Sequence, residues 1–153
     1  MLDSDLVALV HGGVACSVAT RDAERRPAFT RGWGPEVSAD GRTLRLCVHA
    51  PSGSATRANL ENNGAIAVGC HQPTTARALQ IKGVVVSLRE PGAEELEHAE
   101  RHFVAFSVEG ERVGVSASRL RRIFAAPHDL VSVTLSIDEV FDQTPGAAAG
   151  QRV

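Results

Sequence analysis

The sequence has 153 residues, the length of one domain, and it is long enough to bury a core without disulfides or metal ions. Its formal net charge of −2 at pH 7 gives no bulk attraction to nucleic acid or to an anionic membrane, so the expected partner is a small molecule. Three cysteines, Cys16, Cys47 and Cys70, lie far apart in apolar segments, which is typical of reduced thiols in a cytoplasmic protein. The N-terminus lacks the positive charge of a signal peptide, and no apolar run approaches the roughly 20 residues of a membrane span.

Hydrophobic periodicity and turn residues predict short strands and four helices. A helix over residues 2–11 comes first and ends before Gly12-Gly13. The expected strands cover residues 14–20, 27–33, 43–49, 65–70, 78–88 and 130–140, and the other helices cover 54–63, 93–106 and a short segment capped by Ser116. This order favours a closed or nearly closed β-barrel with helices packed outside it.

Three local patterns refine this interpretation. The strand over 43–49 alternates, so Leu44, Leu46 and Val48 are expected to face the core. Gly83 interrupts the strand over 78–88, which indicates a bulge or the close approach of another backbone. Small residues dominate the last segment, which predicts a loose C-terminal tail.

Motifs for metal binding are weak in this sequence. His98 and His102 have the i, i+4 spacing of zinc-binding histidines on a helix, but no third ligand is indicated, and a solvated charged face is the expected explanation. Two strands could bring together at most three of the four further candidates, which are Cys47, His49, Cys70 and His71. We therefore expect no metal site.

Nucleic-acid binding and nucleophilic catalysis are equally weakly indicated. The three arginines of the short helix after Ser116, namely Arg119, Arg121 and Arg122, are expected to cover its solvated side. No G-x-S-x-G elbow is present, and no serine is paired in sequence with a histidine. The sequence therefore assigns no catalytic residue and no nucleic-acid partner.

The segment 53–68, GSATRANLENNGAIAV, predicts a short helix whose N-terminus is suited to an anion. Ser54 or Ser52 can cap this helix, and Asn63-Gly64 can end it. The hydroxyl groups and the Arg57 guanidinium then surround free backbone N–H groups at the positive end of the helix dipole. The pattern indicates a phosphate site, and a capped connector with a solvated arginine is the alternative for this segment alone.

Two other strands place polar and aromatic side chains together. Gln80 and Lys82 fall on one face of the strand over 78–88. Arg31 and Trp33 likewise share one face of the strand over 27–33. Cations, an amide and an aromatic wall suit a planar anionic cofactor.

These motifs resemble the pyridoxamine 5′-phosphate oxidase-like family of FMN-binding split barrels, over roughly residues 6–88. In that family a Gly-Ser-Arg-Lys turn leads into a short helix ending Asn-Asn-Pro, then a strand, a loop and a Gln-Val-Arg-like strand. The matching positions here are Gly53, Ser54, Glu61, Asn62 and Asn63, followed by the strand LQIKG. Ala55 and Thr56 replace the family's phosphate-binding Arg-Lys pair, Arg57 lies one position further along, and the C-terminal Trp-Arg-Leu segment of the oxidase proper is absent.

The resemblance implies a mainly β, α+β protein: a six-stranded antiparallel split β-barrel with peripheral helices over residues 1–141, then a tail over 142–153. It also implies a homodimer with FMN at the interface, acting as a flavin-dependent oxidoreductase on a small molecule, but not as the true oxidase. The implied cofactor-binding residues are Ser54, Thr56 and Arg57 at the phosphate, Gln80 and Lys82 at the ring edge, and Arg31, Gly32 and Trp33 in the lining. Two alternatives stay open: a deazaflavin-dependent reductase of the same fold, and a non-enzymatic haem or small-ligand binder with His49 or His71 on the iron.

Overall fold

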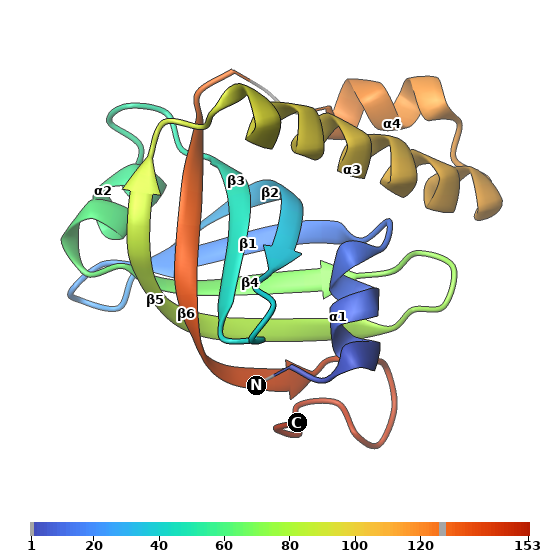
Figure 1. Ribbon diagram of the computed structural model, residues 1–153, viewed down its shortest axis with the longest axis horizontal. Coiled ribbons are helices and arrows are strands. Elements are labelled where there is room, and N and C mark those ends of the chain that lie inside the picture. Colours follow the sequence, from blue (N-terminus) through green and yellow to red (C-terminus); the bar gives the residue numbers. More distant parts are fainter. Residues whose placement is uncertain (1, 126–127) are drawn as a thin grey trace.

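The computed structural model describes residues 2–125 and 128–153, and over these residues it forms a closed six-stranded antiparallel barrel with four helices outside it (Figure 1). The strand order around the barrel is β1-β2-β3-β6-β5-β4. The strands are β1 (Ala15–Arg21), β2 (Pro27–Val37), β3 (Thr43–His49), β4 (Ala65–His71), β5 (Ala78–Arg89) and β6 (Leu130–Asp142). The helices are α1 (Ser4–His11), α2 (Ala55–Asn62), α3 (Ala93–Arg112) and α4 (Ala117–Phe124). The expected fold class is confirmed, and β2 and α3 extend beyond their expected ends.

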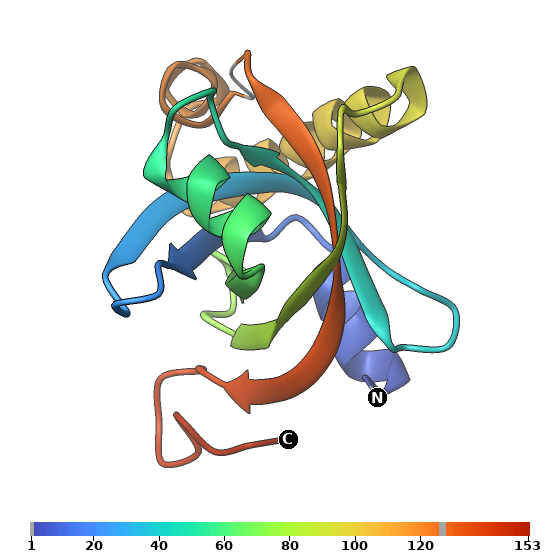
Figure 2. The ribbon, with the colours of Figure 1, turned by 90° about the vertical axis from the view of Figure 1, so that its left-hand side faces the viewer.

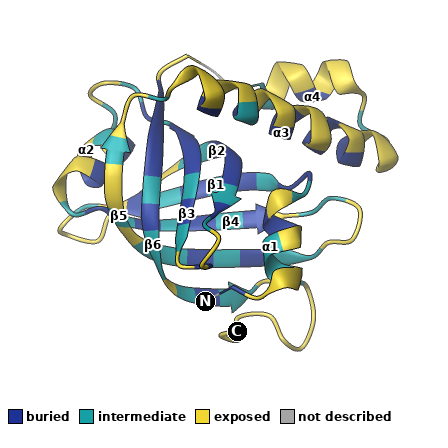
Figure 3. Ribbon diagram, viewed as in Figure 1, coloured by how far each residue is buried: buried dark blue, intermediate teal, exposed yellow. Residues whose placement is uncertain are grey.

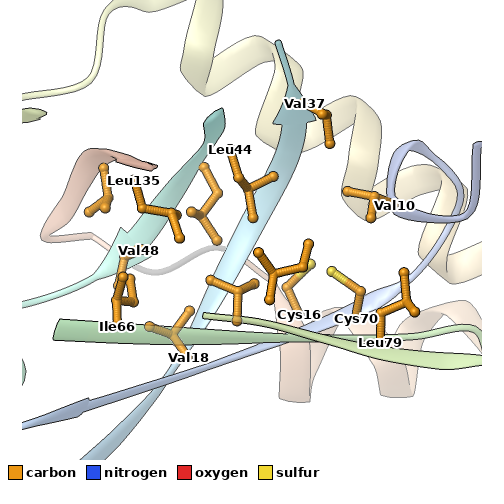
Figure 4. Packing of buried hydrophobic residues seen from close by; sticks show 14 of the residues in the cluster. Val10, Cys16, Val18, Val37, Leu44, Val48, Ile66, Cys70, Leu79 and Leu135 are labelled. Atoms are coloured by element: carbon orange, nitrogen blue, oxygen red, sulfur yellow. The ribbon is translucent and has the colours of Figure 1, made fainter. Parts of the chain in front are cut away.

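The barrel interior is filled by inward-facing aliphatic side chains, as the alternation predicts. Leu44, Leu46 and Val48 are almost completely buried, which confirms the expected core face of β3. Cys16 and Cys70 lie side by side in this core, directly opposite each other on β1 and β4 (Figure 4). A hydrogen bond to Cys70 and burial raise the pKa of the Cys16 thiol well above its usual value. Both thiols are free, as is the buried Cys47.

Gly83 allows β5 and β6 to approach each other closely, so the expected irregularity is confirmed. The β5–β6 register shifts between Lys82 and Gly83. A Cβ atom on Gly83 would lie 1.7 Å from the carbonyl oxygen of Ser136, which no side chain can tolerate. The bulge lets one long strand continue around the barrel.

Helix α3 packs its buried face against β2 and β3 on the outside of the barrel, and α4 packs its buried face against α3 (Figure 3). Their buried side chains form a second apolar cluster with β2 and β3, separate from the barrel core. Trp33, Cys47, Ala99, Phe103, Phe106, Leu120 and Leu130 make up this cluster. Gly110 brings the two helices into contact, because a Cβ atom there would lie 2.4 Å from Leu120 Cδ1.

The C-terminal residues fold back along β6 (Figure 2). Arg152 bridges Phe141, and the N–H of Val153 donates to the carbonyl of Val140 at 2.9 Å. The tail therefore has backbone contacts that its small residues do not predict. Among the described helices, none is both long and apolar enough to cross a membrane.

Candidate functional site

The α2 turn (residues 51–57) folds as the sequence predicts, but its Ser54 and Arg57 side chains are engaged within the protein. The Oγ of Ser54 caps α2 by accepting the N–H of Arg57 at 3.2 Å. Gly53 has a φ of +78°, a conformation that glycine adopts without strain. Thr56 is only 5% exposed. The hydroxyl of Ser54 therefore serves the helix, and the Thr56 side chain is buried.

The charge around Arg57 is negative overall. Its Nε lies 2.5 Å from the carboxylate of Glu61, and its Nη1 lies 3.9 Å from that of Glu90. Asp129 lines the same hollow, which has a volume of about 270 Å³. One guanidinium thus faces three carboxylates. A phosphate does not fit this arrangement, because the only cation that lines the described part of the hollow is already neutralised.

Gln80 and Lys82 lie on the outer face of β5, while Leu79 and Ile81 point into the core, as expected. The ammonium group of Lys82 lies 4.5 Å from the centre of the Phe141 ring. Lys82 also lines a groove over β1, β4, β5 and β6, whose lining includes the small residues Ala19, Ala65, Ala67 and Gly83. This groove shares no lining residue with the hollow beside Arg57.

A third concavity lies between the outer face of β1–β2 and the helices α3 and α4, and we call it the aromatic pocket. It has a volume of about 270 Å³. The sequence contains five phenylalanines, one tryptophan and no tyrosine, and five of these six side chains line this one pocket. Its lining comprises Val14, Ala15, Cys16, Ser17, Phe29, Arg31, Gly32, Trp33, His71, His102, Phe103, Phe106 and Phe124. Such a lining is suited to a planar apolar ring.

The β2 residues of the pocket are tied to the end of α4. The indole N–H of Trp33 donates to the carbonyl of Phe124 at 2.8 Å, and Arg31 donates to the carbonyl of Ile123 at 2.6 Å. The Arg31 guanidinium also lies 4.1 Å from the centre of the Phe124 ring. Gly32 between them has no room for a side chain, since a Cβ atom would lie 2.6 Å from Leu46 Cδ1. The three predicted β2 residues are therefore brought together at one concave surface.

His102 is a buried histidine without a hydrogen-bond partner among the described residues. It is 8% exposed, and neither ring nitrogen meets a partner at ordinary distance and angle. Burial lowers the pKa of His102 to about 4, and the backbone of Val14 offsets only part of this effect. The expected solvated face for His98 and His102 is therefore wrong for His102. This imidazole is neutral at physiological pH and offers one donor and one acceptor.

Glu95 holds the start of α3 against the barrel. Its carboxylate accepts two hydrogen bonds from Arg89, at 2.7 and 2.8 Å, one from Ser132 at 2.6 Å, and one from the N–H of Gly92 at 2.8 Å. Burial alone would raise the pKa of Glu95, but these hydrogen bonds outweigh it and hold the pKa at about 2. The helix that forms one wall of the aromatic pocket is thus anchored by a charge.

Comparisons with known proteins identify the fold. No family model matches this sequence, and no curated protein resembles it significantly in sequence. Solved structures do match. HupZ of Group A Streptococcus is 18% identical with a TM-score of 0.57, over 98% of this chain and 100% of that one. An F420 reductase is 18% identical with a TM-score of 0.58, over 87% and 93%. A pyridoxamine 5′-phosphate oxidase-related, FMN-binding protein of Nostoc punctiforme is 14% identical with a TM-score of 0.51, over 96% and 87%.

The chain is therefore an α+β split-barrel protein. More particularly, it has the fold of the pyridoxamine 5′-phosphate oxidase-like proteins. Identities of this size establish the fold alone, so the chemistry has to be argued from the chain's own residues. Among the described residues, no three His, Cys, Asp or Glu side chains gather as metal ligands.

Proposed function

We propose that this split barrel binds the planar ring of a flavin-class cofactor, FMN or a deazaflavin, in the aromatic pocket and acts with it as an oxidoreductase on a small molecule. The observation that carries the proposal is the gathering of five of the six aromatic side chains around one pocket. A flavin-type ring is flat, electron-poor and polar along one edge, and aromatic walls with one buried polar group suit it. The similar folds of an F420 reductase and of an FMN-binding protein add support.

The protein's part in this function is to hold and shield the ring. Trp33 and Phe103 are nearly buried and provide apolar walls, while Phe29 is 71% exposed and lies at the rim. His102 offers hydrogen bonds to the polar edge of the ring. When bound, a flavin-class cofactor supplies the electron and hydride transfer chemistry that amino-acid side chains lack. No side chain of the pocket is assigned the role of acid or base.

A second candidate is a haem or other small-ligand binding protein without catalysis. One observation favours it: His71, one of the two histidines expected for iron, lies exposed at the aromatic pocket together with His102. His49 does not line the pocket. Haem would give a Soret band, which a flavin lacks.

We further propose that the protein is a homodimer that covers the outer face of β1 and β4. Apart from the strand-end residues Arg21 and His71, the outward residues there are small, namely Ala15, Ser17, Ala19, Ala65, Ala67 and Gly69. The groove over this face carries both signs of charge, with Arg21 and Lys82 near Asp138 and Glu139. A two-fold axis can pair the cations of one copy with the acids of the other, so the second copy is the complementary occupant.

The dimer is tested by light scattering on the wild type and on an Ala67→Glu variant. We expect the wild type to have twice the mass of the chain and the variant to be monomeric with an unchanged circular dichroism spectrum, because this side chain faces outward. Ala105→Glu, at an exposed position of α3, is the matched control and should remain dimeric. A monomeric wild type would rule the dimer out.

Ligand binding is tested first on the protein as purified, by its visible absorption and by mass spectrometry of any molecule that heat releases. Trp33 is the only tryptophan, so its fluorescence then reports titration with FMN and with riboflavin. We expect saturable quenching. Phe29→Ala should weaken binding by about 1 kcal/mol, or about fivefold, through lost stacking. Phe141→Ala removes the one aromatic side chain outside the pocket and should leave the affinity unchanged. An equal loss of affinity in both variants would contradict the proposed location of the ring.

A further inference from the structure

The aromatic pocket carries one uncompensated positive charge. Arg31 is the only Lys or Arg among its described lining residues, and no carboxylate lines it. Arg31 takes part in no ion pair within the part of the chain that the structure describes. One of its five N–H groups donates to the carbonyl of Ile123, which leaves the others for a ligand. Ser17 stands directly opposite Arg31 in the β1–β2 register and adds a hydroxyl donor.

The most buried polar group of the pocket lining is uncharged. Neither ring nitrogen of His102 makes a hydrogen bond of ordinary geometry with the described residues, although the backbone of Val14 lies near enough to favour its protonated form. An unmade hydrogen bond at a buried group is costly, so a ligand that offers both an acceptor and a donor gains from meeting this imidazole. A ligand that brings a negative charge to this depth would lose its hydration without meeting a cation.

Exposure orders these groups from the rim inward. Phe29 and His71 are exposed, Arg31 is half-buried, and His102 is buried. A ligand therefore has its ring between the aromatic walls, its inner edge toward the imidazole and its outer substituent toward the guanidinium. The Arg31 guanidinium, stacked on Phe124, is held in place for this contact.

We infer that the aromatic pocket selects a planar aromatic ligand with an uncharged hydrogen-bonding inner edge, which faces His102, and with one anionic outer group, which Arg31 and Ser17 bind. The inference rests on the proposed function for the position of the ring. It goes beyond it by placing the anion site on β2 and β1 rather than at the α2 turn, where Arg57 faces carboxylates.

The test compares ligands that differ only in the anion. FMN and riboflavin share a ring but differ in the phosphate, and 8-anilinonaphthalene-1-sulfonate and N-phenyl-1-naphthylamine form a second pair that contains no flavin. Affinities are measured by Trp33 fluorescence on the full chain. We expect the anionic member of each pair to bind more tightly, and Arg31→Gln to lower its affinity by about tenfold while leaving the neutral member unchanged.

Matched variants make the result specific. Arg31→Lys should keep most of the preference for the anionic member of each pair. Arg57→Gln at the α2 turn should leave this preference unchanged. His102→Phe should lower the affinities for FMN and riboflavin by the same factor, because the two ligands share the inner edge of the ring. The inference is overturned if Arg31→Gln leaves the preference unchanged in both pairs, or if Arg57→Gln abolishes it. If only the naphthalene pair binds, with an Arg31-dependent preference, the proposed flavin function fails and the inference stands.

Discussion

The α2 turn and the aromatic pocket each present an arginine beside a concave surface, but their surroundings differ. Arg57 forms ion pairs with Glu61 and Glu90, so its charge is neutralised within the protein. Arg31 lies among aromatic side chains in a pocket whose described lining has no carboxylate. The comparison teaches that a cation in a motif position indicates a binding site only when its counter-ion is missing. Three predictions follow from this contrast, and the first concerns what holds the pocket together.

Glu95→Gln is expected to give the largest effect, because it removes a nearly buried charge that joins α3 to β5 and β6. We expect a loss of about 3 kcal/mol in the free energy of unfolding at pH 7, measured by urea denaturation. Weaker ligand binding should accompany it, because α3 forms a wall of the pocket. Ser54→Ala, which removes the α2 cap, should cost only about 1 kcal/mol and leave the pocket intact.

The same variant also predicts a pH dependence. The pKa of Glu95 is held at about 2, below its usual 4.5, so the carboxylate contributes its full stability above pH 4.5. That contribution is lost as the pH falls from 4.5 toward 2. The difference in unfolding free energy between the wild type and Glu95→Gln should therefore shrink over this range. A difference that stays constant down to pH 2 would contradict the role of the charge.

The barrel could be predicted from the sequence because its signals are local. Alternation in 43–49 places Leu44, Leu46 and Val48 correctly, and Gly83 marks the close approach of β6. The cap at Ser54 was also predictable, since a hydroxyl before a helical segment satisfies free N–H groups. Periods of two and of 3.6 residues are set by backbone geometry, so they can be recognised in a single sequence.

The pocket could not be predicted because it is built from distant segments. Trp33 donates to Phe124, 91 residues away, and no local pattern fixes which strands a helix pair will cover. The sequence nevertheless contains a pattern that indicates the burial of His102. Ala99, His102, Phe103 and Phe106 follow the i, i+3, i+4, i+7 spacing of a single apolar stripe, which placed this histidine on the packed face of α3. The pairing of His98 with His102 as a charged surface overlooked that spacing.

The counter-ions of Arg57 were likewise only partly visible. Glu61 lies four residues on in the same helix, a spacing that favours an ion pair. Glu90 and Asp129 reach the hollow through the barrel topology, because β5 ends and β6 begins beside the α2 turn. The sequence could therefore identify the cation but not the charge of its surroundings.

The smallest expected effect comes from removing the carboxylates that pair with Arg57. Glu61→Gln combined with Glu90→Gln leaves Arg57 with Asp129 alone among the carboxylates of the hollow. Because the site is exposed, the gain in affinity for inorganic phosphate should be modest, about fivefold, and it should disappear at high salt. Amide shifts of residues 53–57 under phosphate titration measure it by NMR. A wild type that already binds phosphate there as tightly as the double variant would mean that the carboxylates do not neutralise Arg57, and the contrast between the two arginines would then fail.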